Sequence, residues 1–197
     1  MPKVTAEYRE ARRDEITAAA IRTFANKGFA GASMADIIAE SGLSAGAIYG
    51  HFAGKHEIMM AVAREVIGSR VDDLREFAEG RPAPSPSEVL SHMLPGLSND
   101  LAQPPLLLQV WGQAMVEEGM RRLLWEVFAD LRHVYASYFE AWAREHEGMD
   151  ETTARAWAQR LLPLAIGLGQ GFIVQSAVFE DFDAEAYLAS LREFLPH

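Results

Sequence analysis

The chain has 197 residues, of which 49% are hydrophobic and 23% charged, a composition typical of a globular protein and far from that of a disordered chain. This length suits one domain, or two small ones that share a core, and is too short for most multidomain enzymes. The absence of cysteine excludes disulfides, thiolate metal sites and cysteine nucleophiles, and fits the reducing cytoplasm. The N-terminus is polar, so we expect neither a signal peptide nor a membrane anchor. The apolar stretch Leu161 to Val174 is shorter than the roughly 20 residues of a membrane span, so we expect a cytoplasmic protein without a membrane partner.

The formal net charge is −10, but it is unevenly distributed along the chain. Residues 1–56 hold 7 Lys and Arg against 6 Asp and Glu, so this segment carries +1 and the remainder −11. All three lysines lie in this first segment. The acidity of the whole chain therefore does not exclude a nucleic-acid partner for the N-terminal region.

Apolar residues recur three and four positions apart along most of the chain, which predicts an all-α protein. A first helix of about 17 residues is expected to end at Gly28, because glycine tolerates the left-handed conformation of a C-terminal cap. Ser33 and Asp36 resemble a capping box at the start of a short second helix. That helix ends at Gly42, and Ser44 caps a third helix after a minimal turn, which predicts a helix-turn-helix arrangement.

The rest of the chain is predicted to be helical with one proline-rich loop. A long helix is expected over residues 55–79, followed by a loop at residues 80–86, whose three prolines are incompatible with a helix interior. Glycines and prolines separate the later segments, and Gly119 is expected to lie at one of these breaks. The further helices are predicted at residues 87–102, 105–118, 120–146, 151–178 and 184–195.

The helix-turn-helix segment carries a specific set of residues in the stretch GASMADIIAESGLSAGAIYGHFAGKHE, residues 31–57. The set comprises Phe24 before the Gly28-Phe29 corner, Ser33, Asp36-Ile37, Gly42-Leu43-Ser44, Ile48-Tyr49, His51-Phe52 and Lys55. In these features the chain resembles the TetR family of bacterial transcriptional regulators, which the remainder matches in length and helix pattern only. The resemblance implies a three-helix DNA-binding domain over residues 1–54, followed by a helical ligand-binding and dimerisation domain over residues 55–197.

An exposed third helix fits the major groove of B-DNA, which is about 12 Å wide, with its N-terminal residues towards the base edges. The small side chains there allow close approach but offer few bidentate hydrogen bonds. We therefore expect specificity to rest on Ser44, Tyr49, methyl contacts of Ala45 and DNA shape. Phosphates are expected to be contacted by aromatic, imidazole and ammonium groups near the end of the helix. The predicted DNA-binding residues are Ser33, Ser44, Ala45, Gly46, Tyr49, His51 and Lys55.

Two features of the N-terminal region leave alternatives open. Ile38 stands where the family usually has alanine, and this larger side chain could change the angle of the third helix. Arg9, Arg12 and Arg13 could reach phosphates or a minor groove, but the acidic residues between them are equally compatible with a solvated mixed face.

The segment 120–146 carries a broad aromatic stripe, most of which we expect in the core. The excess of aromatic and methionine side chains on neighbouring helices also suits an adaptable apolar pocket. In TetR-like proteins the helices after the reading domain enclose a small-molecule site. The resemblance therefore implies such a site here, between the helices predicted within residues 55–79, 87–118, 120–146 and 151–178.

Polar residues on otherwise apolar stretches, namely Gln109, Gln113, Tyr135 and Gln170, are candidates for orienting the ligand. We expect an apolar or amphipathic ligand. The net negative charge of residues 57–197 is also compatible with a cationic ligand, although carboxylates usually lie on solvated faces rather than in a binding site. No cofactor is expected, and no metal, since the histidines lack ligand spacing. The predicted ligand-binding residues are Met59, Met93, Trp111, Met115, Trp125, Phe128, Tyr135 and Gln170.

The segment 151–178 is apolar all round and therefore needs two packing partners. One face can pack on its own core, and the other on a twofold-related copy together with segment 184–195, in a four-helix interface as in the family. A homodimer would place two reading helices about 34 Å apart on a pseudo-palindrome. The predicted interface residues are Ile166, Gly167, Gly171, Ile173 and Ala177.

These features favour a DNA-binding transcriptional regulator, a repressor released from its double-stranded operator by a small molecule. No enzyme motif competes with this interpretation. The alternative is a TetR-like scaffold without specific DNA binding that acts as a ligand-binding or protein-interaction module. The small third helix and Ile38 motivate this alternative, and Tyr49, His51 and Lys55 argue against it.

Overall fold

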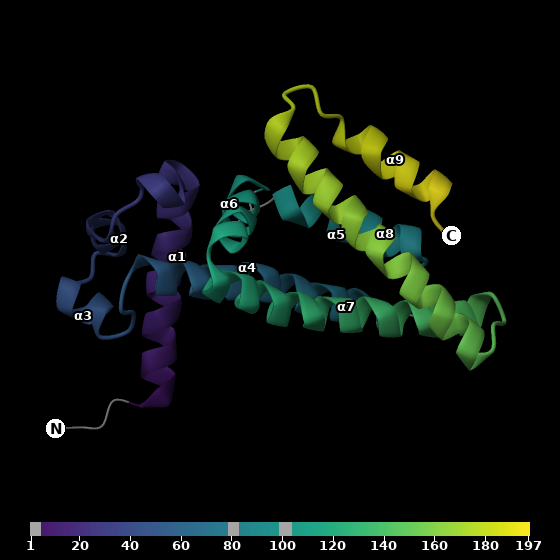
Figure 1. Cartoon of the computed structure of the whole chain (residues 1–197), viewed down its shortest axis with the longest axis horizontal. Helices are drawn as coiled ribbons and strands as arrows, with labels where there is room; N and C mark the ends of the chain where they lie inside the picture. The colour runs from purple at the N-terminus through teal and green to yellow at the C-terminus, as the bar shows by residue number, and fades with distance from the viewer. Residues whose placement is uncertain (1–4, 79–82, 99–103) are drawn as a thin grey trace. The chain divides into compact units, whose positions relative to one another are not determined.

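The computed structural model describes residues 5–78, 83–98 and 104–197 (Figure 1). Within these ranges every regular element is a helix, which confirms the all-α prediction. The described residues form two compact units. The head unit comprises Met1–Val66 with Pro105–Leu124, and the body unit comprises Ile67–Pro104 with Trp125–His197. The predicted functional boundary between residues 54 and 55 stays a prediction.

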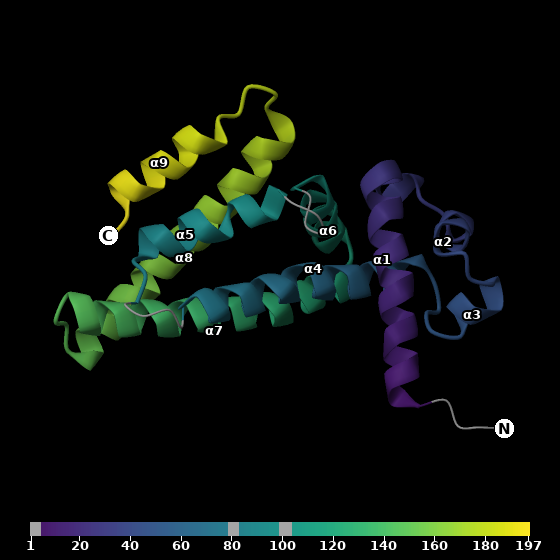
Figure 2. The same ribbon diagram turned by 180° about the vertical axis from the view of Figure 1, so that it is seen from behind.

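The head unit begins with α1 (Ala6–Gly31), α2 (Met34–Ser41) and α3 (Ala45–Tyr49). Figures 1 and 2 show α2 and α3 beside α1. Its other elements are the beginning of α4 (Lys55–Ala78), most of α6 (Pro104–Val116) and the start of α7 (Glu118–His146). The core of the unit consists of fully buried apolar side chains, among them Ile16, Phe24, Ile37, Ile48 and Phe52.

The first helix is longer than its apolar pattern predicts. It begins at Ala6, where Thr5 caps it by accepting a hydrogen bond from the amide of Tyr8. Its first turns are polar and exposed, so they add no apolar periodicity from which a helix could be recognised. Gly28 does interrupt the helix as predicted, with φ 70° and ψ 160°, and one further turn continues to Gly31.

The body unit holds the rest of α4 and α7, with α5 (Pro86–Met93), a short 3-10 helix η1 (Pro95–Ser98), α8 (Glu151–Val178) and α9 (Ala184–Phe194). Leu74, Leu90, Phe139 and Phe172 lie in its core. In both views α9 runs beside α5 and α8 (Figures 1 and 2). The carbonyl of Pro196 accepts a hydrogen bond from the amide of Ser87, which joins the end of the chain to α5.

Several predicted boundaries differ from the structure. The helix predicted over residues 87–102 ends at Met93 because a proline follows at position 95, and residues 99–102 lie outside the described residues. Pro86, assigned to the loop from sequence, is the first residue of α5 and follows the N-cap Ser85. The break between α6 and α7 lies at Glu117 rather than at Gly119.

The apolar stretch Leu161 to Val174 lies within α8, whose bounds are those predicted from the sequence. Over its 28 residues, α8 contains an 18-residue window of mean hydropathy 1.6, so by length and composition alone it could cross a membrane. A core helix satisfies the same criteria. Leu161, Ala165 and Phe172 of α8 are buried in the body core, so its apolar character also has a structural use within this chain.

Candidate nucleic-acid interface and effector site

A capping box fixes the start of α2, as predicted from Ser33 and Asp36. The Ser33 hydroxyl accepts from the amide of Asp36 at 3.2 Å, and Asp36 Oδ2 accepts from the amide of Ser33 at 2.9 Å. Lys27 Nζ of α1 lies 2.6 Å from Asp36 Oδ1. These bonds lower the pKa of Asp36 to about 2, and the bond from Lys27 has the largest effect. The hydroxyl of Ser33, a predicted DNA contact, is therefore already engaged within the head unit.

The turn before α3 has the conformation that its glycine predicts. Gly42 adopts the left-handed conformation, with φ 68° and ψ 6°, and Ile48 anchors α3 in the core. Ser44 caps α3 and accepts from the amide of Ala47 at 3.2 Å. The exposed residues at the outer side of this short helix form what we call the reading surface: Ser44, Ala45, Gly46 and Tyr49.

Arg13 of α1 fixes the junction between α3 and α4. Its Nη1 donates to the carbonyl of His51 at 2.7 Å, and the guanidinium carbon lies 4.1 Å from the ring centroid of the buried Phe52. Glu57, 3.9 Å from Arg13, accepts from the amide of Ala53 at 2.7 Å. The sequence left Arg13 open between a phosphate contact and a solvated charge; in the structure it holds the end of the reading helix.

Lys55, a predicted phosphate contact, also has partners within the head unit. Its Nζ donates to the carbonyls of Phe29 at 2.7 Å and Ala32 at 2.8 Å, and lies 4.5 Å from the ring centroid of Phe29. This ammonium therefore joins the start of α4 to the corner between α1 and α2. The imidazole of His51, also in the predicted set, is half-buried next to this junction and makes no hydrogen bond among the described residues.

Most basic residues of α1 are paired with acidic ones. Arg12 pairs with Glu15, and Arg22 lies 2.6 Å from Glu40. Arg9 is exposed, and among the described residues its guanidinium has neither an ion pair nor a hydrogen bond. Arg9 is thus the α1 arginine that is free for an external anion. The sequence did not distinguish it from its neighbours, because the pairing depends on the fold.

The predicted ligand-binding residues are divided between the two units. In the head unit Met59 is buried, Trp111 is half-buried and Met115 is 79% exposed. In the body unit Met93 and Tyr135 are buried and Phe128 is half-buried, whereas Gln170 is exposed. Trp125 is 70% exposed, with the guanidinium carbon of Arg132 at 5.8 Å from its ring centroid.

The two glutamines of α6 also differ. Gln109 Oε1 accepts a hydrogen bond of 2.7 Å from the amide of Phe29, so its carboxamide belongs to the head unit's own structure. Gln113, one turn later, is half-buried and its side chain has no hydrogen bond among the described residues.

The body unit contains three buried polar groups of interest, of which the sequence singled out Tyr135 but not Ser91 or Arg70. Ser91 Oγ on α5 and Arg70 Nε on α4 are buried without a hydrogen-bond partner. The hydroxyl of Tyr135 on α7 makes no hydrogen bond among the described residues, and burial raises its pKa well above the ordinary value. Buried polar groups are normally paired, so these three are candidates for ligand contacts. A serine or arginine within a helix gives no sequence signal of this kind.

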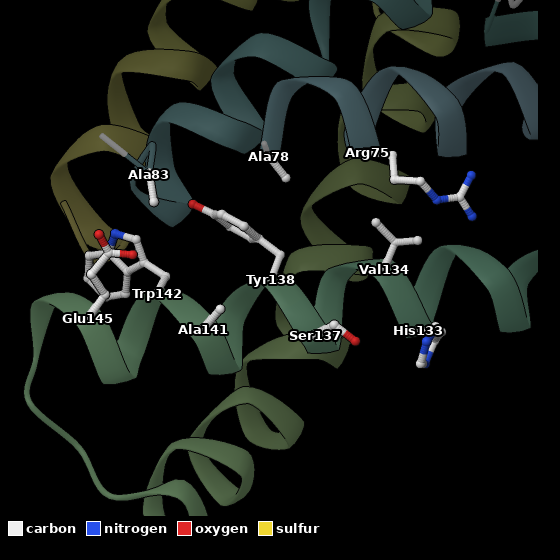
Figure 3. A pocket seen from close by; sticks show the side chains of 10 residues that line it. All are labelled: Arg75, Ala78, Ala83, His133, Val134, Ser137, Tyr138, Ala141, Trp142 and Glu145. Carbon is white, nitrogen blue, oxygen red and sulfur yellow. The ribbon is translucent and has the colours of Figure 1, made fainter. Parts of the chain in front are cut away.

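A pocket of about 510 Å³ lies between the end of α4 and α7 in the body unit (Figure 3). The ring of Tyr138 crosses it, and the tyrosine hydroxyl donates to the carbonyl of Pro84. None of the eight predicted ligand-binding residues lines this pocket. The lining residues are Arg75, Ala78, Ala83, His133, Val134, Ser137, Tyr138, Ala141, Trp142 and Glu145.

The predicted interface residues of α8 do not share one environment. Gly167 is exposed, Ile166 and Ala177 are half-buried, and Ile173 is only 6% exposed. A Cβ on Gly171 would lie 3.1 Å from the hydroxyl of Tyr187, so this glycine lets the chain's own α9 approach. The large exposed apolar side chains of α8 are instead Leu164, Val174 and Val178.

Comparison with known proteins yields two family models that match successive regions of the chain. Residues 16–62 match the bacterial regulatory proteins of the tetR family, and residues 82–197 match the C-terminal region of BetI-type transcriptional repressors. The transcriptional regulator BetI of Brucella canis is 26% identical over 200 residues, which cover 99% of this chain and 94% of BetI. The regulators YerO and YfiR of Bacillus subtilis are 31% and 35% identical over 42% and 40% of this chain, but the matches span only 29% and 38% of their own lengths.

Solved structures show the same fold at low sequence identity. FadR of Bacillus subtilis in complex with stearoyl-CoA has a TM-score of 0.71 and 17% identity, with 91% of this chain and 95% of FadR covered. A Saccharomonospora viridis protein in complex with choline has a TM-score of 0.71 and 23% identity, with 95% and 98% covered. Because the BetI-type match alone spans more than half of the chain, the protein belongs to the TetR family of DNA-binding transcriptional regulators and is not an enzyme.

Proposed function

We propose that the protein represses transcription in the cytoplasm as a homodimer on a pseudo-palindromic operator, and that a small-molecule effector releases it. The observation that carries the proposal is the reading surface, a set of small and exposed groups on a helix that is fixed at both ends. The match to BetI-type repressors supports repression as the direction of control.

The chemistry of the reading surface suggests how DNA is recognised. Ala45 and Gly46 allow close approach to the base edges, and Ser44 and Tyr49 supply hydroxyl groups. The exposed Tyr49 is proposed to contact base edges, and the unpaired Arg9 is the proposed phosphate contact, in place of the internally bonded Lys55. With few free cations, we expect specificity to depend on van der Waals contacts and on DNA shape.

The exposed apolar face of α8 supports the proposed homodimer. Leu164, Val174 and Val178 are spaced so as to lie along one side of the helix, and their exposed fractions are 62%, 40% and 59%. Burial of such a face against a second copy would remove apolar surface from water. The predicted set centred on Gly167 lies on the same stretch of helix.

The effector site is proposed within the body unit, around the unpaired polar atoms of Arg70 and Ser91 and the hydroxyl of Tyr135. These groups suit a ligand that is apolar or amphipathic and carries at least one hydrogen-bonding group. Stearoyl-CoA and choline, bound by two proteins of this fold, are the two ligand types to test first.

The test is selection of duplexes from a random library, followed by fluorescence anisotropy with the selected duplex and a scrambled one. We expect at least about a thousandfold preference for the selected duplex, the lower end of specific recognition. Ser44→Ala and Tyr49→Phe should reduce this preference. Choline chloride and stearoyl-CoA are then titrated into the complex, and release by one of them identifies the effector class. Failure of the wild-type protein to prefer any duplex would refute the proposal.

A further inference from the structure

We propose that Gln109 on α6 is a positioning residue for DNA binding, because it fixes the corner at Gly28 and Phe29 that holds the starts of α2 and α4. This inference rests on the specific operator binding proposed above. It assigns no DNA contact to Gln109, which acts only through the backbone of Phe29.

The corner needs an external hydrogen-bond partner. Gly28 has φ 70° and ψ 160°, which are not helical values, so the backbone of α1 changes direction just before Phe29. Phe29 is only 6% exposed, and its amide donates to Gln109 Oε1 at 2.7 Å. A buried amide without an acceptor is unfavourable, so the position of Gln109 constrains the position of the corner.

The opposite side of Phe29 is held by α4. The carbonyl of Phe29 accepts from Lys55 Nζ at 2.7 Å, and the same ammonium donates to the carbonyl of Ala32 at 2.8 Å. Lys55 is the first residue of α4, and Ala32 directly precedes Ser33, the N-cap of α2. A shift of Phe29 is therefore transmitted to α2 and to α4, the two helices that flank the reading helix in sequence.

Gln109 is the polar link between α6 and this corner. Among the described residues, the bond from Phe29 to Gln109 is the one side-chain hydrogen bond that joins residues 105–124 to residues 5–65. The two residues are 80 positions apart in the chain. Movement of α6 along its axis or about it would stretch this bond and displace the corner. Gln109 thereby ties the geometry of the reading surface to the position of α6.

The test uses two pairs of matched variants. Gln109→Leu removes the acceptor at similar side-chain size, whereas Gln109→Glu keeps an acceptor oxygen at the same reach. Gln113→Leu and Gln113→Glu introduce the same changes one turn later, where the side chain has no hydrogen bond among the described residues. Each variant is titrated with the duplex selected by the wild-type protein and with its scrambled form.

We expect Gln109→Leu to lower affinity for the selected duplex about tenfold while affinity for the scrambled duplex changes less than about twofold, since nonspecific binding is mainly electrostatic. The affinity of Gln109→Glu for the selected duplex should remain within about threefold of that of Gln113→Glu. The affinity of Gln113→Leu should resemble that of the wild type. The inference is overturned if Gln109→Leu keeps the wild-type ratio of affinities for the selected and the scrambled duplex. It is also overturned if Gln109→Glu loses as much affinity for the selected duplex as Gln109→Leu does. If the wild type itself selects no duplex, it is the proposed function that fails.

Amide hydrogen exchange tests the same link on the protein alone, whatever the DNA results. Gln109→Leu should accelerate exchange at Phe29 and in α2 relative to Gln113→Leu, with little change in α8. Equal exchange at Phe29 in these two variants would show that the corner does not depend on Gln109.

Discussion

At the residue scale, two glycines determine how the head unit is formed. Gly28 and Gly42 both have positive φ values, near 70°, that other residues adopt only with strain. One breaks α1 and the other makes the turn into α3. Both positions were predicted from sequence, because a left-handed backbone is a local property with a strong residue preference.

Replacement of Gly42 by alanine should lower the free energy of unfolding by about 1–2 kcal/mol, the usual cost of a left-handed conformation for a residue with a Cβ. Gly112→Ala is the matched control, because Gly112 is in the helix α6 and a Cβ there meets no atom within 4 Å. The control should gain up to about 1 kcal/mol from its helix propensity. Urea unfolding measures both, and equal effects of the two substitutions would contradict this account of the turn.

The capping box gives a prediction about acid stability. The pKa of Asp36 is lowered from 3.8 to about 2, so its charged form favours folding. That contribution is complete above about pH 4 and is lost as the pH falls through the folded-state pKa. Asp36→Asn should therefore be less stable than the wild type near neutral pH, and the difference should narrow towards pH 2. Thermal unfolding from pH 2 to pH 6 measures it; a pH-independent difference would contradict the assigned pKa shift.

At the element scale, the short reading helix depends on its neighbours for its position. α3 has 5 residues, too few for an independently stable helix. Its start is fixed by Ser44 and the Gly42 turn, and its end by the bond from Arg13 to the carbonyl of His51. The orientation of this element thus depends on α1 as well as on the residues at its own start.

Arg13→Gln should lower the free energy of unfolding by about 1–2 kcal/mol, because it removes a charged hydrogen bond and the contact with Phe52. It should also weaken binding to the selected duplex. Arg12→Gln removes the same charge from an exposed pair and should leave stability within about 0.5 kcal/mol. Urea unfolding and anisotropy of the two variants measure these effects. Similar losses in both would indicate a simple charge effect.

Sequence reasoning identified the features of these elements that depend on near neighbours. The Ser33–Asp36 capping box, the Gly42 turn and the Ser44 cap involve residues close in the chain, and all were confirmed. The roles of Lys55 and Gln109 were not predicted, since their partners at Phe29 lie 26 and 80 positions away. The end of α5 was also predicted too late, although Pro95 gave a local signal.

At the scale of the whole molecule, the charge is unevenly distributed along the chain. The first 56 residues carry +1 and the rest −11, so the acidic remainder repels DNA while the N-terminal region does not. Because most α1 arginines are paired, we expect the protein to neutralise few DNA phosphates. The logarithm of the binding constant falls with the logarithm of the salt concentration by about 0.9 per neutralised phosphate, so we expect a shallow salt dependence.

The proposed dimer is tested by Leu164→Glu. Leu164 is 62% exposed on α8, and a carboxylate there should prevent burial of the apolar face. We expect a shift from dimer to monomer in sedimentation velocity and a loss of affinity for the pseudo-palindromic duplex. Gln159→Glu adds the same charge at an exposed polar position of the same helix and should remain dimeric. A dimeric Leu164→Glu protein would place the interface elsewhere.

The most direct test of the central claim is the affinity of the purified protein for its selected duplex and for a scrambled duplex of equal length, at low and at near-physiological salt. A regulator that reads sequence through the surface around Ser44 and Tyr49 should keep a preference of about a thousandfold or more at both salt concentrations. Ser44→Ala and Tyr49→Phe should reduce that preference. Equal affinities that disappear together as salt rises would contradict sequence-specific recognition by this chain.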